Sequence, residues 1–140
     1  DLGFEIGKGI LLQPGTDVTI VATGHLVWEA LEAAKELAAQ SIIAEVINIH
    51  TIKPLDDELI LKSVQKTGCL VSAEEHNYLG GMGESIAGLL ATQHPCPMEF
   101  VATQDTFGES GTPAQLMAKY GLDKTAIIKK VLAVRKRIKI

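Results

Sequence analysis

Short apolar runs alternate along this chain with segments of helical spacing, and this alternation limits the fold more than any other feature. Residues 17–22 read Asp-Val-Thr-Ile-Val-Ala, nearly continuously apolar and β-branched, as in a parallel strand buried on both faces. After a short turn, apolar residues recur at helical spacing from Val27 to Gln40. Further pairs of this kind follow, which predicts a parallel α/β sheet with helices on both of its faces.

The expected elements have clear start and stop signals. We expect strands at residues 9–13, 17–22, 43–49, 69–73 and 98–102. A Pro-Gly turn stops the first strand, whose closeness to the second suits an edge position. Asp56 is a good N-cap for a helix that Gly68 closes. Thr112 opens a capping box for a late helix, and Asp123 caps the last helix.

Length and composition fit one compact domain. The 140 residues are 46% apolar and 21% charged, as in an average soluble domain. We assign residues 1–140 to a single domain in which residues 1–8 are a lead-in segment. No apolar run approaches the roughly 18 residues that cross a bilayer, so we expect no membrane contact. Because the sequence starts on Asp1 and not on Met, we expect it to be a piece of a longer protein.

The two cysteines carry no pairing or metal signature. Cys69 and Cys96 are far apart and neither belongs to a CxxC motif. Each adjoins an expected strand, where a free cysteine behaves as a small buried hydrophobe. We therefore expect neither a disulfide nor a metal at these residues, and a reducing, cytoplasmic location.

The C-terminal segment is strongly basic. Residues 124–140 hold seven lysines and arginines and no acidic residue. Such a segment can bind nucleic acid. Here the basic residues punctuate an apolar helical pattern that includes Ile127, Val131 and Leu132, with no interleaved aromatic residue. We favour a solvated helix face and expect no nucleic-acid partner.

The densest group of chemically useful side chains lies in residues 71–84, which we call the elbow. It is expected to hold the end of a buried strand, a polar turn with Glu74, Glu75, His76 and Tyr78, and the start of a helix. A carboxylate beside an imidazole can act as a general base. However, adjacent strand residues point to opposite faces, and no GxSxG nucleophile accompanies them. A role in a domain or subunit contact is favoured over catalysis and over a simple solvated loop.

Glycines at 80, 81 and 83 surround the expected start of that helix. Free N–H groups at a helix start can hold an anion, so a bound phosphate or nucleotide is one reading. The pattern is GGxG and lacks both GxGxxG and GK[ST]. Glycines that permit a tight turn and close helix–sheet packing are the favoured reading.

The four histidines give no metal signature. His25, His50, His76 and His94 show neither HxxxH nor HxH spacing. The first three each follow an expected strand and could share one edge of the sheet. We expect no metal site.

Four stretches together resemble the C-terminal domain of transketolase. They span about residues 9 to 134 in matching order and spacing, and they are residues 17–24, 51–56, 74–84 and 109–116 with 120–122. Related thiamine enzymes share single pieces of this set, among them deoxyxylulose phosphate synthase and the beta subunits of 2-oxo acid dehydrogenases. The Ser-Gly-Thr-Pro start of the late helix, at residues 110–113, favours transketolase.

The resemblance implies a fold, an activity and partners. The fold would have three layers, α/β/α, around five strands of which the first is antiparallel to the others. The parent enzyme would move a two-carbon ketol unit between sugar phosphates of the pentose phosphate pathway, using thiamine diphosphate and a divalent cation. The partners of this chain would be the thiamine-binding domains or subunit of the same enzyme, and the parent would be a homodimer.

No catalytic, cofactor-binding or metal-binding residue carries over to this chain. In the family, the activating glutamate and the GDG…N metal motif lie in other domains, and neither is found here. We expect an assembly role, no activity in isolation, and a contact surface formed by Glu74, Glu75, His76, Tyr78, Gly80, Gly81 and Gly83. Two alternatives stay open. One is a partner-recruiting domain of a dehydrogenase beta subunit or deoxyxylulose phosphate synthase, and the other is a stand-alone phosphate- or nucleotide-binding module.

Overall fold

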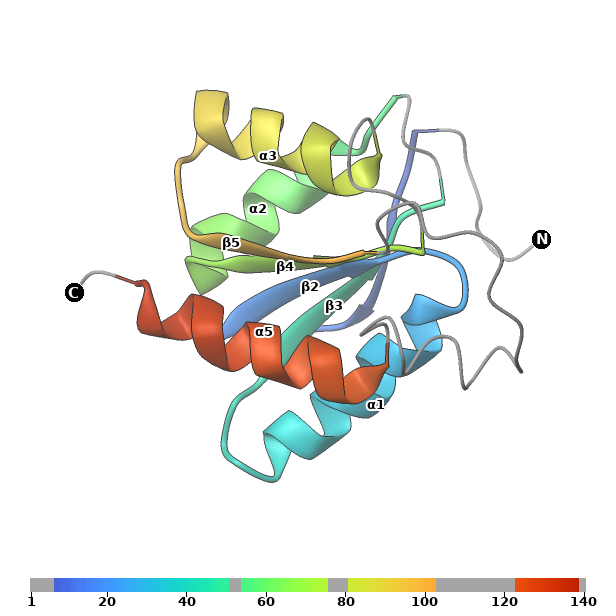
Figure 1. Cartoon of the computed structure of the whole chain (residues 1–140). Helices are drawn as coiled ribbons and strands as arrows, with labels where there is room; N and C mark the ends of the chain where they lie inside the picture. The colour runs from blue at the N-terminus through green and yellow to red at the C-terminus, as the bar shows by residue number, and fades with distance from the viewer. Residues whose placement is uncertain (1–6, 51–53, 76–80, 103–122, 139–140) are drawn as a thin grey trace.

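The computed structural model describes residues 7–50, 54–75, 81–102 and 123–138. Within them, five strands form one sheet in the order β1-β3-β2-β4-β5 (Figure 1). The strands are β1 (Ile10–Gln13), β2 (Val18–Ala22), β3 (Ala44–Asn48), β4 (Leu70–Ala73) and β5 (Met98–Val101). β1 runs antiparallel to β3, and the other neighbouring pairs are parallel. The expected mostly parallel sheet with an antiparallel edge strand is confirmed.

Helices cover both faces of the sheet. They are α1 (Leu26–Ala38), α2 (Asp57–Thr67), α3 (Met82–Gln93) and α5 (Lys124–Lys136). In Figure 1, α2 and α3 lie above the sheet, and α1 and α5 lie below it. The three α/β/α layers implied by the resemblance are therefore present. The helix expected after Thr112 lies outside the described residues.

Two apolar clusters hold the layers together. Val18, Ile20 and Ala22 of β2 pack toward α1 and α5, whereas Val21 packs toward α2 and α3. The whole of β2 is buried, because side chains alternate between the two faces and each face has a helical cover. The nearly continuous apolar run in the sequence is thus the central strand of the sheet.

The expected helix ends are confirmed at three positions. The Asp56 side chain accepts a hydrogen bond from the Leu59 N–H at 3.2 Å and caps α2. Gly68 ends that helix in the left-handed conformation, with φ of 79°. Asp123 accepts from the Ala126 N–H at 3.1 Å and caps α5.

Polar contacts also attach α2 to the sheet. The Thr19 hydroxyl of β2 lies 2.6 Å from the hydroxyls of both Ser63 and Thr67. Glu45 of β3 is buried, and its carboxylate accepts from the Lys66 ammonium at 2.6 Å and from the backbone N–H of Gly15 at 2.9 Å. Burial alone would raise the pKa of Glu45, but these hydrogen bonds from Lys66 and Gly15 and one involving Ser63 hold that pKa below its usual value.

The two cysteines are free and lie on opposite faces of the sheet. Cys69 belongs to the cluster beneath α1 and α5, whereas Cys96 packs against the cluster beneath α2 and α3. Burial raises the pKa of the Cys69 thiol to about 11. Cys69 is therefore the buried hydrophobe that the sequence suggested, and Cys96 is half-buried.

The basic C-terminal segment forms α5 as expected, with one correction to its apolar face. Ile127, Val131 and Val134 are buried, while Leu132 is 37% exposed. The buried positions follow i, i+4, i+7 spacing, and Leu132 falls off that face. Among the described residues, no helix combines the length and apolar character that a membrane span requires.

Candidate functional site

The polar turn of the elbow begins where β4 ends, at the side of the sheet formed by the carboxyl ends of the parallel strands. Register pairs place the last residues of β2, β3 and β4 side by side, since Ala22 pairs with both Asn48 and Ala73. Loops at this edge are the usual place for ligands and partners in α/β sheets. The structure describes Glu74, Glu75, Gly81 and Gly83 of the elbow, whereas His76, Tyr78 and Gly80 lie outside the described residues.

Glu74 is turned into the molecule and binds the start of α3. Its side chain is 1% exposed. One carboxylate oxygen accepts from the Met82 N–H at 3.0 Å, and the other accepts from the Gly83 N–H at 2.5 Å. Its own backbone N–H donates to the Val101 carbonyl of β5 at 2.9 Å. Glu74 therefore links β4, β5 and α3.

This arrangement requires glycine at position 83. A Cβ added there would lie 2.7 Å from the Phe100 ring and 3.0 Å from the second carboxylate oxygen of Glu74. Both distances are shorter than ordinary van der Waals contact, so a side chain would push α3 away from the sheet. Gly83 is thus a close-packing glycine, as the favoured reading of the glycine pattern expected.

Glu74 supplies the negative charge that a helix N-terminus favours. The first N–H groups of a helix lack partners within the helix and carry partial positive charge. In α3, a buried carboxylate of the same chain already binds the amides of Met82 and Gly83. A phosphate at this helix start would have to displace Glu74. The geometry therefore argues against the stand-alone phosphate-binding alternative at this position.

The expected surface orientation of Glu74 needs correction. Its burial and its two hydrogen bonds to α3 make it a positioning residue within the chain and not part of an exposed contact. Residues 74 and 75 lie at the point where the strand ends, so the next side chain, Glu75, lies nearer the surface and is half-buried. The contact role of Glu75, His76 and Tyr78 stays a prediction.

Two of the histidines follow neighbouring strand ends. His25 follows β2 and His50 follows β3, and both are exposed. His94 lies at the opposite edge, where it ends α3. Among residues 7–50, 54–75, 81–102 and 123–138, no three histidine, cysteine or carboxylate side chains come together as metal ligands.

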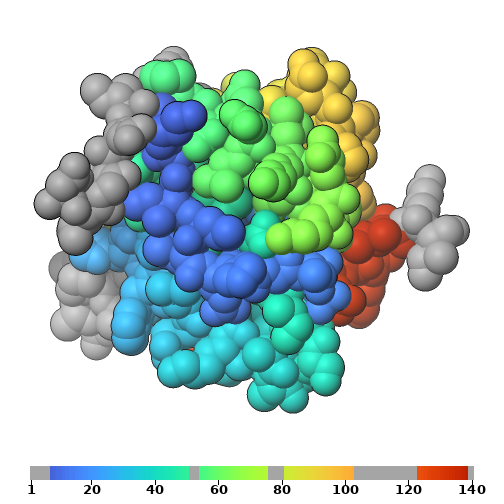
Figure 2. All heavy atoms as spheres, turned by 180° about the vertical axis from the view of Figure 1, so that it is seen from behind, coloured from blue at the N-terminus to red at the C-terminus, as the bar shows by residue number. Residues whose placement is uncertain are grey.

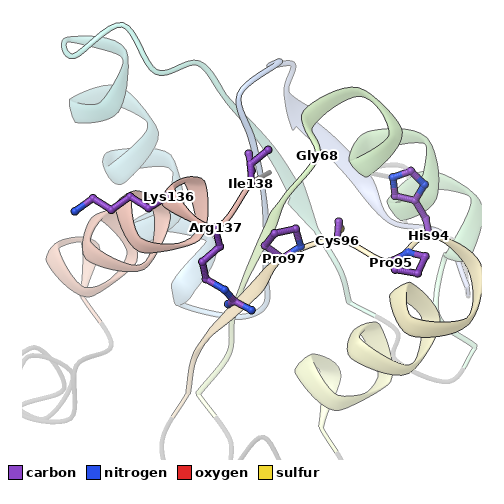
Figure 3. Close-up of a pocket in the computed structure, with 8 residues that line it drawn as sticks. All are labelled: Gly68, His94, Pro95, Cys96, Pro97, Lys136, Arg137 and Ile138. Atoms are coloured by element: carbon purple, nitrogen blue, oxygen red, sulfur yellow. The ribbon is translucent and has the colours of Figure 1, made fainter. Parts of the chain in front are cut away.

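A pocket at the amino ends of β4 and β5, on the side of the sheet opposite to the elbow, was not expected from the sequence. It has a volume of about 940 Å³ and is lined by Gly68, residues 94–97 and residues 136–138 (Figure 3). The C-terminal ends of α2, α3 and α5 meet there, and helix ends of this kind carry partial negative charge. Arg137, which lines the pocket, is already paired with the Glu99 carboxylate at 2.6 Å, so its charge is not free for an anion. Only the fold brings these distant segments together.

Comparison with known proteins decides the family. The model of the family described as "Transketolase, C-terminal domain" matches residues 7–127. The chain belongs to this family. A transketolase C-terminal domain of this kind accounts for the sheet order, the antiparallel edge strand and the glycine-rich elbow described above.

Three known proteins are similar to this transketolase C-terminal domain in sequence or structure. It is 46% identical to the 6-deoxy-6-sulfo-D-fructose transketolase subunit SqwH of a Clostridium species over 96% of the chain and 42% of that protein. It is 42% identical to 1-deoxy-D-xylulose-5-phosphate synthase 1 of Geobacter sulfurreducens over 89% of the chain and 20% of that protein. A solved structure titled "Split gene transketolase, inactive beta4 tetramer" matches with a TM-score of 0.93 and 43% identity, over 97% of the chain and 45% of that structure.

This transketolase C-terminal domain spans less than half the length of these relatives. Among the described residues of the elbow, the buried carboxylate of Glu74 binds the start of α3.

Proposed function

We propose that this chain is the C-terminal part of a thiamine diphosphate-dependent transketolase, of the kind divided between two subunits. The parent enzyme moves a two-carbon ketol unit between sugar phosphates, and this domain serves its assembly. The observation that carries the proposal is the likeness along nearly the whole chain to a split-gene transketolase, with 43% identity and a TM-score of 0.93. The 46% identity to a transketolase subunit supports the same reading.

The domain has no catalytic role of its own in this proposal. Glu74 is the most buried carboxylate of the elbow, and its two oxygens bind the amides of α3. A general base must lie within reach of the substrate proton, whereas Glu74 is 1% exposed. Glu74 is therefore used for structure, and the partners of the elbow are other parts of the same enzyme.

The described residues do not fit thiamine diphosphate and its divalent cation. A diphosphate needs free N–H groups or cations, yet the first amides of α3 are occupied by Glu74. The cation needs several oxygen ligands, and no three candidate ligands converge in the described part of the chain. We therefore propose that the cofactor binds to the thiamine-binding domains or subunit, outside this chain.

Calorimetric titration of the isolated chain with thiamine diphosphate and Mg²⁺ tests this assignment. We expect no binding heat above dilution. Tight, magnesium-dependent binding would overturn the proposal. In the complete enzyme, His76→Ala is expected to weaken assembly before turnover, because the elbow is proposed to face a neighbouring domain or subunit. A variant that assembles normally yet loses turnover would contradict that role.

A second candidate parent is 1-deoxy-D-xylulose-5-phosphate synthase. The 42% identity over 126 residues to such an enzyme favours it as the runner-up. Assays of the complete enzyme for ketol transfer between sugar phosphates and for formation of 1-deoxy-D-xylulose 5-phosphate separate the two parents. The sugar is also open, since one relative is named for a sulfonated fructose. The free cysteines agree with a cytoplasmic enzyme, which we propose as the location.

A further inference from the structure

Residues 7–9, which we call the entry segment, lie on the same side of the sheet as the elbow. β1 is antiparallel to β3, so its first residue, Ile10, pairs with the last residue of β3, Asn48. The carboxyl end of β3 lies in line with those of β2 and β4, since Ala22 pairs with both Asn48 and Ala73. The chain therefore enters the described fold at the side of the sheet where α/β proteins commonly meet ligands and partners.

Asp56 binds the entry segment with the same carboxylate that caps α2. One oxygen accepts from the Leu59 N–H at 3.2 Å, and the other accepts from the Gly9 N–H at 2.8 Å. Asp56 is 8% exposed, so little water competes for these bonds. Hydrogen bonds to an ionised acceptor are stronger than bonds between neutral groups. A single side chain thus ties the start of β1 to the start of α2, across 47 positions of sequence.

Two glycines bring the backbone of the entry segment close enough for this contact. A Cβ added at Gly9 would lie 2.7 Å from the side chain of Ile49 and 3.0 Å from that of Leu59. Gly7 has a left-handed φ of 80°, and a Cβ there would lie 3.0 Å from the Pro54 ring. Figure 2 shows the blue start of the described chain beside the green residues that lead into α2. The entry segment therefore packs directly against β3 and α2.

We propose that Asp56 is a positioning residue that fixes the direction in which the preceding part of the parent enzyme joins this domain. The proposal rests on the proposed function, in which this chain is the C-terminal part of a larger enzyme. The matched family is described as a C-terminal domain, and the chain spans less than half of its relatives. In such a parent, the backbone before Gly7 meets the fold on the side of the elbow. A fixed entry segment holds the preceding part on that side.

Hydrogen exchange measured by NMR on the chain tests the anchor. Asp56→Ser keeps a good N-cap for α2, but its shorter side chain has one oxygen in place of two. We expect the Gly9 amide to exchange at least about tenfold faster than in the wild type, because hydrogen bonds to charged groups contribute on this order. Asp123→Ser is the matched control, since Asp123 caps α5 in the same way on the other face of the sheet. It should leave the exchange of Gly9 unchanged.

Two results with these variants would overturn the anchor. One is equal Gly9 exchange in Asp56→Ser and the wild type, and the other is an equal rise in Asp123→Ser. Where Asp56→Ser fails to fold, exchange of the wild type at increasing urea concentration decides. The amides of Gly9 and Leu59 share one acceptor side chain, so both should be protected and should open with the same urea dependence. A Gly9 amide that is unprotected in the folded wild type contradicts the proposal.

Small-angle X-ray scattering on the complete enzyme tests the positioning role, which a helix cap alone would not affect. Asp56→Ser should broaden the distribution of distances between this domain and the preceding part. Asp123→Ser should keep the wild-type distribution. An unchanged distribution in Asp56→Ser, in a protein whose Gly9 amide is released, would show that the bond does not set the direction of the preceding part.

The outcome is separable from that of the proposed function. Binding of thiamine diphosphate to the isolated chain would overturn the proposed function and leave the exchange of Gly9 unaffected. An unprotected Gly9 amide would overturn the anchor and leave the family and the parent activity as they are.

Discussion

The backbone N–H of Gly83 donates a 2.5 Å hydrogen bond to the carboxylate of Glu74, across the turn that joins β4 to α3. The same carboxylate also accepts a hydrogen bond from the preceding amide, that of Met82. One buried side chain therefore fixes the direction in which α3 leaves the sheet. The position of the elbow, and of any partner that contacts it, depends on this pair.

Replacing Glu74 tests that dependence. Glu74→Ala removes the acceptor of two buried N–H groups, and we expect a loss of about 2–4 kcal/mol in the free energy of unfolding. Glu74→Gln should lose less stability than Glu74→Ala, because the remaining amide oxygen can still accept one of the two hydrogen bonds. The amide nitrogen that replaces the other oxygen cannot accept the second one. Urea denaturation followed by circular dichroism measures both. Glu84→Gln, at an exposed position in the first turn of α3, is the control and should change stability by less than about 1 kcal/mol. Equal effects at positions 74 and 84 would contradict the capping role.

Replacing two glycines of α3, Gly83 and Gly88, by alanine should change the stability of the chain in opposite directions. Gly83→Ala places a Cβ 2.7 Å from the Phe100 ring, so we expect a loss of about 1–3 kcal/mol. Gly88→Ala meets nothing within 4 Å in the middle of the same helix, and higher helix propensity should stabilise the chain by up to about 1 kcal/mol. Thermal and urea unfolding of the two variants check the pair. Equal changes in stability for both variants would show that close packing against Phe100 is not the reason for glycine at position 83.

Acid should remove the contribution of Glu45. Hydrogen bonds from Lys66 and Gly15 and one involving Ser63 outweigh burial and hold the folded pKa below its usual value. A group with a depressed folded pKa stabilises the fold fully above its unfolded pKa of about 4.3, and loses that contribution as pH falls through the folded pKa.

Unfolding free energies of the wild type and of Glu45→Gln between neutral pH and acid measure this linkage. The difference between the two proteins should be constant above the unfolded pKa and should shrink as the pH falls below it. A difference that grows toward acid would mean that the Glu45 pKa is raised in the fold. Lys66→Met should reduce the pH dependence, because it removes the hydrogen bond that contributes most to lowering the Glu45 pKa.

The two cysteines should react at different rates. Cys69 is fully buried with its pKa raised to about 11, so its thiol is protonated and inaccessible near neutral pH. Burial raises the pKa of Cys96 as well, but this residue is half-buried and borders the pocket. Reaction with an aromatic disulfide reagent should label Cys96 first, and Cys69 only under denaturing conditions. Cys96→Ser, which leaves Cys69 alone, should abolish the native-state reaction. Fast native labelling of that variant would place Cys69 nearer the surface.

Much of the fold followed from local signals in the sequence. The β-branched run at residues 17–22 predicted the central strand, because a strand with helices on both faces has no polar side. Asp56 and Asp123 predicted helix starts, since each cap binds an amide three positions along the chain. Gly68 predicted a helix end because left-handed backbone favours glycine. These interactions span a few residues, so the sequence alone determined them.

Tertiary structure decided the orientation of Glu74 and the pocket beside Cys96. Glu74 turned inward because α3 presents two unpaired amides at that point, and no local pattern reveals where a helix start will lie after a turn. The pocket needs the ends of three helices to meet. The sequence by itself therefore determined the elements and the family resemblance. Only the packing of those elements determined which side chains are buried as anchors and which surfaces are left to partners, because burial depends on contacts between residues far apart in the chain.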